Sequence, residues 1–153
     1  SDAHHNIVRL GIGLFGLSDT NRKLHNVLSF KTNISQIKSL EPNSSVGYGR
    51  GYVSSKSEQI ATLPVGYADG LFRALGNQKF SVSVKGKPAK IVGRVCMDMC
   101  MIDISGIDCQ EGDEVIIFDS LETIREMANL VQTIPYEIIS RIADRVKRVY
   151  IED

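Results

Sequence analysis

The order of the local patterns limits the fold of this chain more than any other feature. Short β-type segments fill the sequence up to Phe118, and helical periodicity begins only after that point. The clearest β pattern is the alternation of Phe80, Val82 and Val84 with polar residues before a turn at Gly86, which predicts one arm of a hairpin. Many strands followed by a few helices predict a mainly β fold with two short helices near its C-terminus.

Further strands are expected in the other apolar segments. Within residues 27–40 the apolar pattern loses its phase between Ile34 and Ile37, which predicts one strand with a bulge or a twist. Residues 6–17 are almost continuously apolar or glycine, as in a strand that leaves a buried sheet. The remaining strands are expected at residues 59–65, 90–104, 115–118 and 148–151, and residues 66–76 are expected to form a loop with one helical turn.

Helical signals are confined to the last third of the chain. Ser120 can cap a helix, and Pro135 can open a second one. The apolar positions of the first helix follow a 3.6-residue period and are Leu121, Ile124, Met127, Ala128 and Val131. Both helices are short, so they are expected to cover part of the β-domain rather than to form a domain of their own.

The composition is that of a single globular domain without a strong charge. The chain has 153 residues, of which 42% are hydrophobic, and this is enough to bury one core. Its 18 basic and 18 acidic side chains leave no net charge, so neither nucleic acid nor a membrane surface is an expected partner. No apolar run is long enough to span a membrane and no signal-peptide pattern is present, so the chain is expected to be soluble and cytoplasmic.

The cysteines indicate neither a disulfide framework nor a metal site. Cys96, Cys100 and Cys109 are odd in number and form no paired C-x-x-C motif. Asp98 lies between the first two, and metal ligation there can be imagined. The segment is nevertheless expected to be a strand in which these cysteines are small buried side chains. No metal is therefore expected, and the thiols are expected to be reduced.

A glycine motif near the N-terminus has the pattern of a dinucleotide-binding loop but not its context. Gly11, Gly13 and Gly16 match G-x-G-x-x-G, yet no amphipathic helix follows and no second parallel strand appears at the spacing of a βαβ unit. Dinucleotide binding is therefore disfavoured. A weaker interpretation remains open, in which exposed backbone N–H groups in this segment form a nest for a phosphate.

Tyr48 lies in a second glycine-rich segment, residues 47–52. A phenol placed next to a cation can exchange protons with carbon acids, so this tyrosine is a candidate acid–base group. A tyrosine that packs at the base of a loop explains the same pattern. The residues alone leave both interpretations open.

Charged side chains also occur in two further segments, residues 61–73 and 93–99. Asp69 precedes a glycine in the first of these, where a functional role and ordinary turn chemistry are both open. Arg94 and Asp98 interrupt an otherwise apolar stretch and therefore need partners. A salt bridge from Arg94 to Asp69 or Asp98 and a role for Arg94 in substrate binding both remain open.

These segments, in this order, resemble the C-terminal domain of the pyridoxal-phosphate-dependent alanine racemases. The most specific blocks are G-Y-A-D-G at residues 66–70 and G-R-V-C-M-D at residues 93–98. The similar segments are residues 8–16, 46–50, 61–73, 91–98 and 142–148, the last of which contains the family's closing R-V-x-R. Together they span almost the whole chain.

The resemblance implies a closed or nearly closed antiparallel β-barrel-like domain that completes the active site of another subunit. In this family a TIM barrel carries pyridoxal 5′-phosphate on a lysine, and the β-domain of one subunit faces the barrel mouth of its partner in a homodimer. Residues 1–17 are then expected to be the remnant of the last strand of that barrel, and residues 18–153 the β-domain. The full-length enzyme is expected to interconvert L- and D-alanine for peptidoglycan synthesis, whereas this chain alone lacks the cofactor lysine and is expected to be inactive.

The resemblance also implies roles for residues that would act in the partner's active site. Tyr48 is similar to the family's catalytic tyrosine, which exchanges the α-proton of alanine on the face opposite the cofactor lysine. Met97 is similar to a residue whose backbone N–H meets the substrate carboxylate, with Cys96 and Asp98 beside it.

Three further residues match positions at the mouth of the family's active site. Tyr67 is expected to narrow the mouth and contact the substrate. Arg73 and Arg94 are expected to line the entryway and attract a small carboxylate.

The residues implied in cofactor binding lie near the N-terminus. Arg9 is similar to the arginine that contacts the pyridine nitrogen, where it disfavours protonation of the ring. Gly11 and Ile12 are similar to the backbone donors to the cofactor phosphate, which agrees with the nest interpretation. Asp144 departs from the family, because some relatives have a phosphate-contacting tyrosine there, and no cofactor role is expected for an aspartate.

Three alternatives accompany this interpretation. One is a racemase of broader specificity that also acts on serine or other small amino acids. Another is that this chain alone serves only as a dimerisation and half-site module. The third is a decarboxylase with the same two-domain architecture, which is disfavoured because those enzymes share the fold more than the G-Y-A-D-G and C-M-D blocks.

Overall fold

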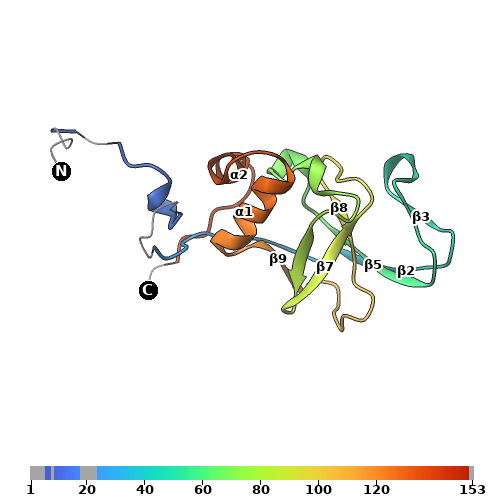
Figure 1. Ribbon diagram of the computed structural model, residues 1–153. Helices are drawn as coiled ribbons and strands as arrows, with labels where there is room; N and C mark the ends of the chain where they lie inside the picture. Colours follow the sequence, from blue (N-terminus) through green and yellow to red (C-terminus); the bar gives the residue numbers. More distant parts are fainter. Residues whose placement is uncertain (1–5, 8, 18–23, 152–153) are drawn as a thin grey trace.

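The computed structural model describes residues 6–7, 9–17 and 24–151, and most of them belong to a β-domain (Figure 1). Seven strands form one antiparallel sheet in the order β1-β9-β6-β7-β8-β5-β2. Their bounds are Phe30–Asn33 (β1), Gln36–Leu40 (β2), Glu58–Leu63 (β5), Ser81–Val84 (β6), Lys87–Val92 (β7), Cys100–Asp103 (β8) and Glu114–Phe118 (β9). The predicted mainly β, antiparallel architecture is confirmed, including the hairpin formed by β6 and β7.

Strands β1 and β2 are consecutive parts of one extended segment that brings the two edges of the sheet together. Only Ile34 and Ser35 separate them, and both continue the pairing. The Ile34 N–H donates to the Asp113 carbonyl at 3.0 Å, and the Ser35 N–H donates to the Thr62 carbonyl at 2.9 Å. The segment therefore pairs first with β9 and then with β5, which curls the sheet into a barrel-like shape.

This change of partner explains the loss of phase in the sequence pattern. The expected single strand is two strands, and the slip between Ile34 and Ile37 falls where the first ends and the second begins. The register irregularity itself lies earlier, between Phe30 and Lys31. Because β1 and β2 pair with different neighbours, one alternation of core-facing side chains does not continue through the junction.

The core lies between the curled sheet and two helices. Helix α1 (Leu121–Leu130) begins after Ser120, whose Oγ accepts a hydrogen bond from the Thr123 N–H at 3.2 Å. Helix α2 (Pro135–Ser140) begins at its proline. Each helix buries an isoleucine in the main apolar cluster, which also contains residues of six strands of the sheet. Both predicted helices are confirmed, and Figure 1 shows them at the end of the sheet opposite β3.

A separate two-stranded hairpin projects from the other end of the barrel. Its strands are β3 (Ser45–Val46) and β4 (Tyr52–Val53), which pair with each other and with no strand of the main sheet. After β5, the chain forms the expected loop, which contains two 3-10 turns, η3 (Tyr67–Asp69) and η4 (Arg73–Leu75).

Residues 93–99 form a loop between β7 and β8, so the prediction of one strand over residues 90–104 is wrong. Strand β7 ends at Val92, and Gly93 adopts φ +66°, a left-handed conformation that breaks the extended path. The misleading signal came from the continued apolar residues of this segment. Val95 among them is buried as a loop residue rather than as part of a strand.

The strands expected at the two ends of the chain are not found among the described residues. Ile12–Phe15 form a 3-10 turn (η1), and residues 148–151 pair with no strand. The side chains of Ile7 and Leu10 are 87% and 72% exposed, whereas Leu17 is buried in the main core. A strand needs a neighbour for its backbone hydrogen bonds, and no strand among the described residues pairs with these segments.

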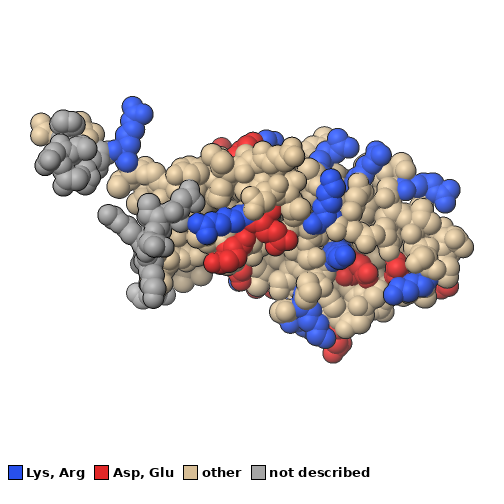
Figure 2. Space-filling view, in the orientation of Figure 1, with Lys and Arg blue, Asp and Glu red and all other residues tan. Residues whose placement is uncertain are grey.

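The surface has no single dominant charge on the face drawn in Figure 2, where basic and acidic side chains are both distributed over the barrel. This agrees with the balanced composition of the chain. None of the helices in the described residues has the length and apolar character needed to cross a membrane.

Candidate active site

The projecting hairpin carries Tyr48 at its tip. A short 3-10 turn, η2 (Tyr48–Arg50), joins β3 to β4, and Gly47 and Gly49 enter it with φ values of +76° and +65°. These left-handed conformations cost glycine little, which explains why glycines alternate through the tip. The Tyr48 side chain is 76% exposed and forms no hydrogen bond with any described residue. Its phenol is therefore available to a molecule outside this domain.

Arg94 packs beneath this tip. A Cβ atom placed on Gly51 would lie 3.2 Å from Cγ of Arg94, and one placed on Gly49 would lie 3.5 Å from its Nη1. The tip glycines thus allow the arginine side chain to lie against the backbone on either side of Tyr48. This contact joins the hairpin to the loop of residues 93–99.

The base of the hairpin is held by Tyr52. Its hydroxyl donates a hydrogen bond to Oε2 of Glu58 at 2.7 Å, and Glu58 is only 5% exposed. This hydrogen bond, together with burial and the negative charges of Glu58 and Asp103, raises the pKa of Tyr52 to about 12. The Tyr52 phenol therefore remains protonated and serves as the donor near neutral pH.

The G-Y-A-D-G loop lies directly on the loop of residues 93–99. The Tyr67 N–H donates to the Cys96 carbonyl and the Ala68 N–H to the Met97 carbonyl, both at 3.0 Å. Gly66 is required at the junction, because a Cβ there would overlap the same two carbonyl oxygens. Oδ2 of Asp69 accepts from the Gly66 N–H at 2.8 Å and closes the turn. The two blocks that are most specific in sequence therefore form one packed unit.

Arg145 clamps this unit. Its Nε donates to Oδ1 of Asp69 at 2.7 Å, and its Nη2 donates to Oδ1 of Asp98 at 2.6 Å. These two hydrogen bonds raise the pKa of Arg145. The salt bridge considered from Arg94 to Asp69 or Asp98 is therefore wrong. Both carboxylates pair with Arg145 instead, which follows them by 76 and 47 positions in the chain. The only sequence signal for a role of Arg145 was that it opens the closing R-V-K-R at residues 145–148.

The backbone N–H of Met97 is the second free group of the candidate site, after the Tyr48 phenol. Met97 follows Cys96, whose own N–H donates to the Met99 carbonyl at 2.9 Å. No described residue accepts a hydrogen bond from the Met97 N–H. The side chains of Met97 and Tyr67 are 54% and 40% exposed beside it. The loop thus offers a free donor at an accessible surface.

The three cysteines are free, and two of them differ sharply in environment. Cys100 begins β8 and is fully buried, and burial raises the pKa of its thiol to about 12. Cys96 is half-buried in the loop. The expectation that Cys96 lies in a strand is wrong, because β8 begins only at Cys100. No group of histidine, cysteine, aspartate or glutamate side chains within the described ranges is placed to hold a metal ion.

Arg73 lies in the loop that follows the G-Y-A-D-G block. It begins η4 and is exposed. The turn is attached to the 93–99 loop through Asn77, whose N–H donates to the Gly93 carbonyl at 2.7 Å. The structure therefore gathers one set of predicted site residues on adjoining loops. They are Tyr48, Tyr67, Arg73, Arg94, Cys96, Met97 and Asp98.

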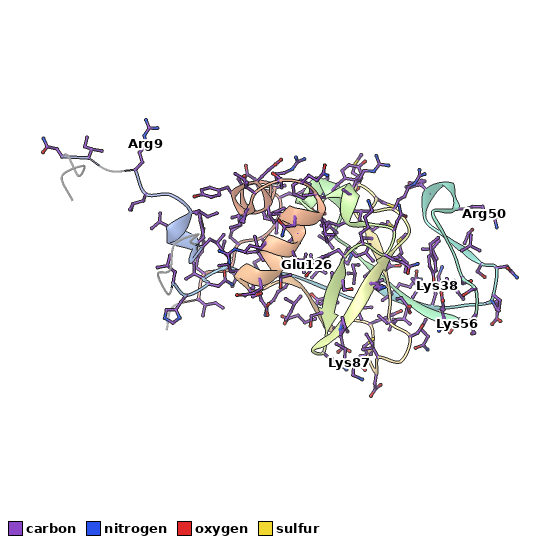
Figure 3. All side chains as sticks on the ribbon, viewed as in Figure 1. Arg9, Lys38, Arg50, Lys56, Lys87 and Glu126 are labelled. Carbon is purple, nitrogen blue, oxygen red and sulfur yellow. The ribbon has the colours of Figure 1, made fainter. Side chains whose placement is uncertain are left out.

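Arg9, Gly11 and Ile12 are not part of that set. Figure 3 shows Arg9 at one extreme of the molecule and Arg50, next to the Tyr48 position, at the other. Arg9 and Gly11 are exposed, and Ile12 is half-buried against the core. Arg9, which is predicted to contact the cofactor, and the hairpin that carries Tyr48 therefore lie at opposite ends of the described molecule.

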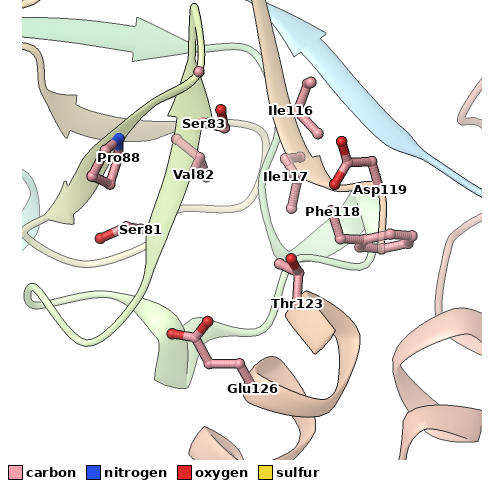
Figure 4. Close-up of a pocket in the computed structure, with 11 residues that line it drawn as sticks. Ser81, Val82, Ser83, Pro88, Ile116, Ile117, Phe118, Asp119, Thr123 and Glu126 are labelled. Atoms are coloured by element: carbon pink, nitrogen blue, oxygen red, sulfur yellow. The ribbon is translucent and has the colours of Figure 1, made fainter. Parts of the chain in front are cut away.

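A hollow of about 430 Å³ lies elsewhere, between strands β6 and β9 and the start of α1 (Figure 4). It is lined by mixed side chains such as Ser83, Phe118, Thr123 and Glu126. None of the predicted site residues lines it, and it holds no cluster of groups suited to catalysis. The candidate active site is therefore the exposed loop surface and not this hollow.

The family described as "Alanine racemase, C-terminal domain" matches residues 27–150. An alanine racemase of Helicobacter acinonychis is 41% identical over 95% of this chain, and alanine racemase 2 of Caldanaerobacter subterraneus is 44% identical over 97% of it. The solved alanine racemase of Clostridium difficile superposes with a TM-score of 0.88 at 40% identity, over 97% of this chain and 40% of that one. The alanine racemase of Bartonella henselae, solved with covalently bound pyridoxal phosphate, gives 0.85 at 29% identity over 92% of this chain and 40% of that one.

The barrel-like β fold is thus shared with the solved structures of these proteins. The chain belongs to the family of alanine racemase C-terminal domains. It spans 41% of the length of each of these two curated relatives.

Proposed function

We propose that this chain is the C-terminal part of a pyridoxal-phosphate-dependent alanine racemase, and that its loop end completes the active site of a partner subunit. The observation that carries the proposal is that the Tyr48 phenol and the Met97 N–H are both free. They lie on two segments that Arg94 joins. The proposal includes the interconversion of L- and D-alanine for peptidoglycan synthesis in the cytoplasm, as the resemblance implies.

Tyr48 is the proposed acid–base group on one face of the substrate. A proton-transfer group must come within hydrogen-bond reach of the carbon it deprotonates. Its 76% exposure leaves the phenol free to approach an alanine held by another domain. The resemblance implies a second base on the opposite face of the substrate, the cofactor lysine of the TIM barrel. This lysine would return a proton from the other side and so invert the stereocentre.

The Met97 N–H is the proposed contact for the substrate carboxylate, with Cys96, Asp98 and Tyr67 around it. The charges of this surface favour an anionic group. Asp69 and Asp98 share the single positive charge of Arg145. The exposed Arg94 and Arg73 add two more, so these five side chains carry an excess of one positive charge.

Such an excess raises the local concentration of a small carboxylate at the entrance of the site.

Pyridoxal phosphate, when bound, makes the α-proton of the amino acid acidic by delocalising the electron pair left behind. The segment at Arg9 fits two ends of this cofactor. No described residue accepts a hydrogen bond from the N–H groups of Gly11 and Ile12. A Cβ atom placed on Gly11 would meet nothing within 4 Å, which leaves room for a phosphate. The exposed Arg9 guanidinium can donate to the ring nitrogen.

The proposal includes a dimer because the cofactor residue Arg9 and the Tyr48 hairpin are far apart in one chain. Arg9 and the Tyr48 hairpin lie at opposite ends of the molecule in Figure 3, so they cannot meet at one substrate within a single chain. In a homodimer, each hairpin can reach the cofactor held by the other subunit. Alanine and a second copy of the full-length protein are thus the proposed partners.

The test is exchange of the α-proton of alanine in deuterated water by the full-length enzyme. The rates from L-alanine and from D-alanine are compared for wild type, Tyr48→Phe and a control, Tyr136→Phe, which alters an exposed tyrosine on α2. Tyr48→Phe is expected to block exchange from L-alanine far more than from D-alanine, while the control leaves both rates unchanged. Equal rates for wild type and Tyr48→Phe with both enantiomers would overturn the assignment.

A further inference from the structure

We propose that Glu58 is a positioning residue for Tyr48. Through the hydrogen bond it accepts from Tyr52, Glu58 fixes the hairpin that carries Tyr48 and thereby sets the rate of proton transfer on one face of the substrate. This inference rests on the proposed function, since it assigns Glu58 a part in the same reaction.

The hairpin has few attachments to the rest of the domain. Strands β3 and β4 pair only with each other. Val46 and Tyr52 pack on a small apolar cluster that is separate from the main core and also contains Ile60, Val92 and Met101. In addition, Arg94 lies beneath the tip. Apolar contacts resist separation but are non-directional, so they permit sliding and tilting of the hairpin.

The hydrogen bond between Tyr52 and Glu58 is the one directional side-chain link between β4 and the main sheet among the described residues. Glu58 begins β5 and pairs with Leu40 of β2, so its backbone belongs to the rigid barrel. The 2.7 Å distance to the Tyr52 hydroxyl is that of a strong bond to a charged acceptor. This link therefore constrains the direction of Tyr52 relative to the barrel, which the apolar contacts do not.

The burial of Glu58 argues that the link does more than stabilise the fold. The residue is 5% exposed, and no lysine, arginine or histidine of the described residues forms an ion pair with it. Burying a carboxylate without a cation is costly, and an apolar residue would fill the same space more favourably. What the carboxylate adds is direction, which an apolar contact cannot supply.

A displacement of Tyr52 also displaces Tyr48. Tyr52 pairs with Val46, and these two residues bracket the tip. The tip itself contains three glycines and adopts left-handed conformations, so it has little side-chain packing of its own to define the phenol position. A shift at its base therefore moves the phenol, and a shift of about 1 Å at a reacting group can cost on the order of a hundredfold in rate.

The experiment compares full-length variants by the ratio of α-proton exchange rates from L-alanine and D-alanine. The variants are Tyr52→Phe, Glu58→Leu and Glu58→Gln, with Tyr48→Phe as the reference. Ser120→Ala is the control, because it removes a structural hydrogen bond at the start of α1, away from the hairpin. A general loss of folded enzyme lowers both rates together and leaves their ratio unchanged.

We expect Tyr52→Phe and Glu58→Leu to lower exchange from L-alanine about tenfold more than exchange from D-alanine. The ratio of the two rates should thus change in the same direction as in Tyr48→Phe. Glu58→Gln, whose amide oxygen can still accept from Tyr52, is expected to restore most of the ratio. Ser120→Ala is expected to leave it at the wild-type value. An unchanged ratio in both Tyr52→Phe and Glu58→Leu overturns the role of Glu58 when Tyr48→Phe shows its asymmetry. If Tyr48→Phe itself shows no asymmetry, the proposed function fails first.

Discussion

The two halves of the candidate site are built in different ways. The Tyr48 hairpin is a two-stranded projection linked to the barrel by a small apolar cluster and the hydrogen bond from Tyr52 to Glu58. The unit formed by residues 66–70 and 93–99 is joined by backbone hydrogen bonds and clamped by Arg145. The first arrangement presents a side chain on a projection with few attachments, whereas the second presents a backbone N–H within a packed unit. The position of Tyr48 therefore depends on fewer contacts than that of the Met97 N–H.

The strongest test of this difference compares alanine substitutions at glycines of the two halves. Gly66→Ala is expected to lower the free energy of unfolding by about 3 kcal/mol, because its Cβ would overlap backbone carbonyls that cannot move without breaking the loop contacts. Gly51→Ala is expected to cost less than about 1 kcal/mol, because its Cβ meets the flexible side chain of Arg94 and its φ of −61° suits alanine.

Urea unfolding of the chain measures both values. Gly11→Ala is the control, since its Cβ would meet nothing within 4 Å and its φ is −108°. A cost for Gly51→Ala as large as that for Gly66→Ala would show that the hairpin is as tightly constrained as the clamped unit.

The clamp itself is tested by Arg145→Ala and Arg145→Lys. The alanine variant leaves Asp69, whose side chain is only 14% exposed, without its cation, so the urea midpoint is expected to fall measurably but by less than for Gly66→Ala. Lysine is expected to recover only part of this loss, because a single ammonium lacks the fork that reaches two carboxylates. Full recovery by lysine would mean that charge alone, and not the bridge, holds the unit.

The pH dependence of stability tests the Tyr52 link. Its hydrogen bond is expected to contribute about 1–2 kcal/mol at pH 8. The pKa of Tyr52 is raised from 10.0 to about 12, so this contribution is fully present below pH 10 and is lost as the pH rises towards 12.

The difference in free energy of unfolding between wild type and Tyr52→Phe should therefore be constant up to pH 10 and shrink above it. The comparison with Tyr52→Phe removes the effect of other groups that titrate in the same range. A difference that stays constant to pH 11.5 would contradict the raised pKa.

The smallest expected effect concerns thiol reactivity. Cys100 begins β8 directly after the clamped unit and is fully buried, and burial raises the pKa of its thiol to about 12. It should therefore resist alkylation in the native protein at pH 8, while the half-buried Cys96 reacts. Peptide mass spectrometry of the alkylated chain reports both sites, and labelling in urea is the positive control. Rapid native labelling of Cys100 would show that the unit opens readily.

Local patterns predicted the elements whose partners are close in sequence. The alternation around Val82 gave the β6–β7 hairpin, and Ser120 and Pro135 marked the starts of both helices. The loop of residues 93–99 was missed because its apolar side chains continue the pattern of a strand, while the left-handed Gly93 that interrupts it has no signature in hydrophobicity.

Contacts between distant segments were beyond local reasoning. Arg145 could not be matched to Asp69 and Asp98 from the sequence, because several arginines had the required charge and only the folded chain selects one. The family resemblance supplied the candidate site residues, and the structure gathers those of the loop end on one surface. Their chemical roles, and the boundary drawn after residue 17, stay predictions.

The extended segment that contains β1 and β2 has a consequence for how this protein is made on the ribosome. Its second half can pair with β5 early in synthesis, but its first half must wait for β9, since Phe30 pairs with Phe118. Contacts between such distant residues slow folding, because a long loop must be closed before the pairing is rewarded. A nascent chain that ends before β9 therefore exposes an unpaired strand edge, and this is the stage at which chaperones are most needed.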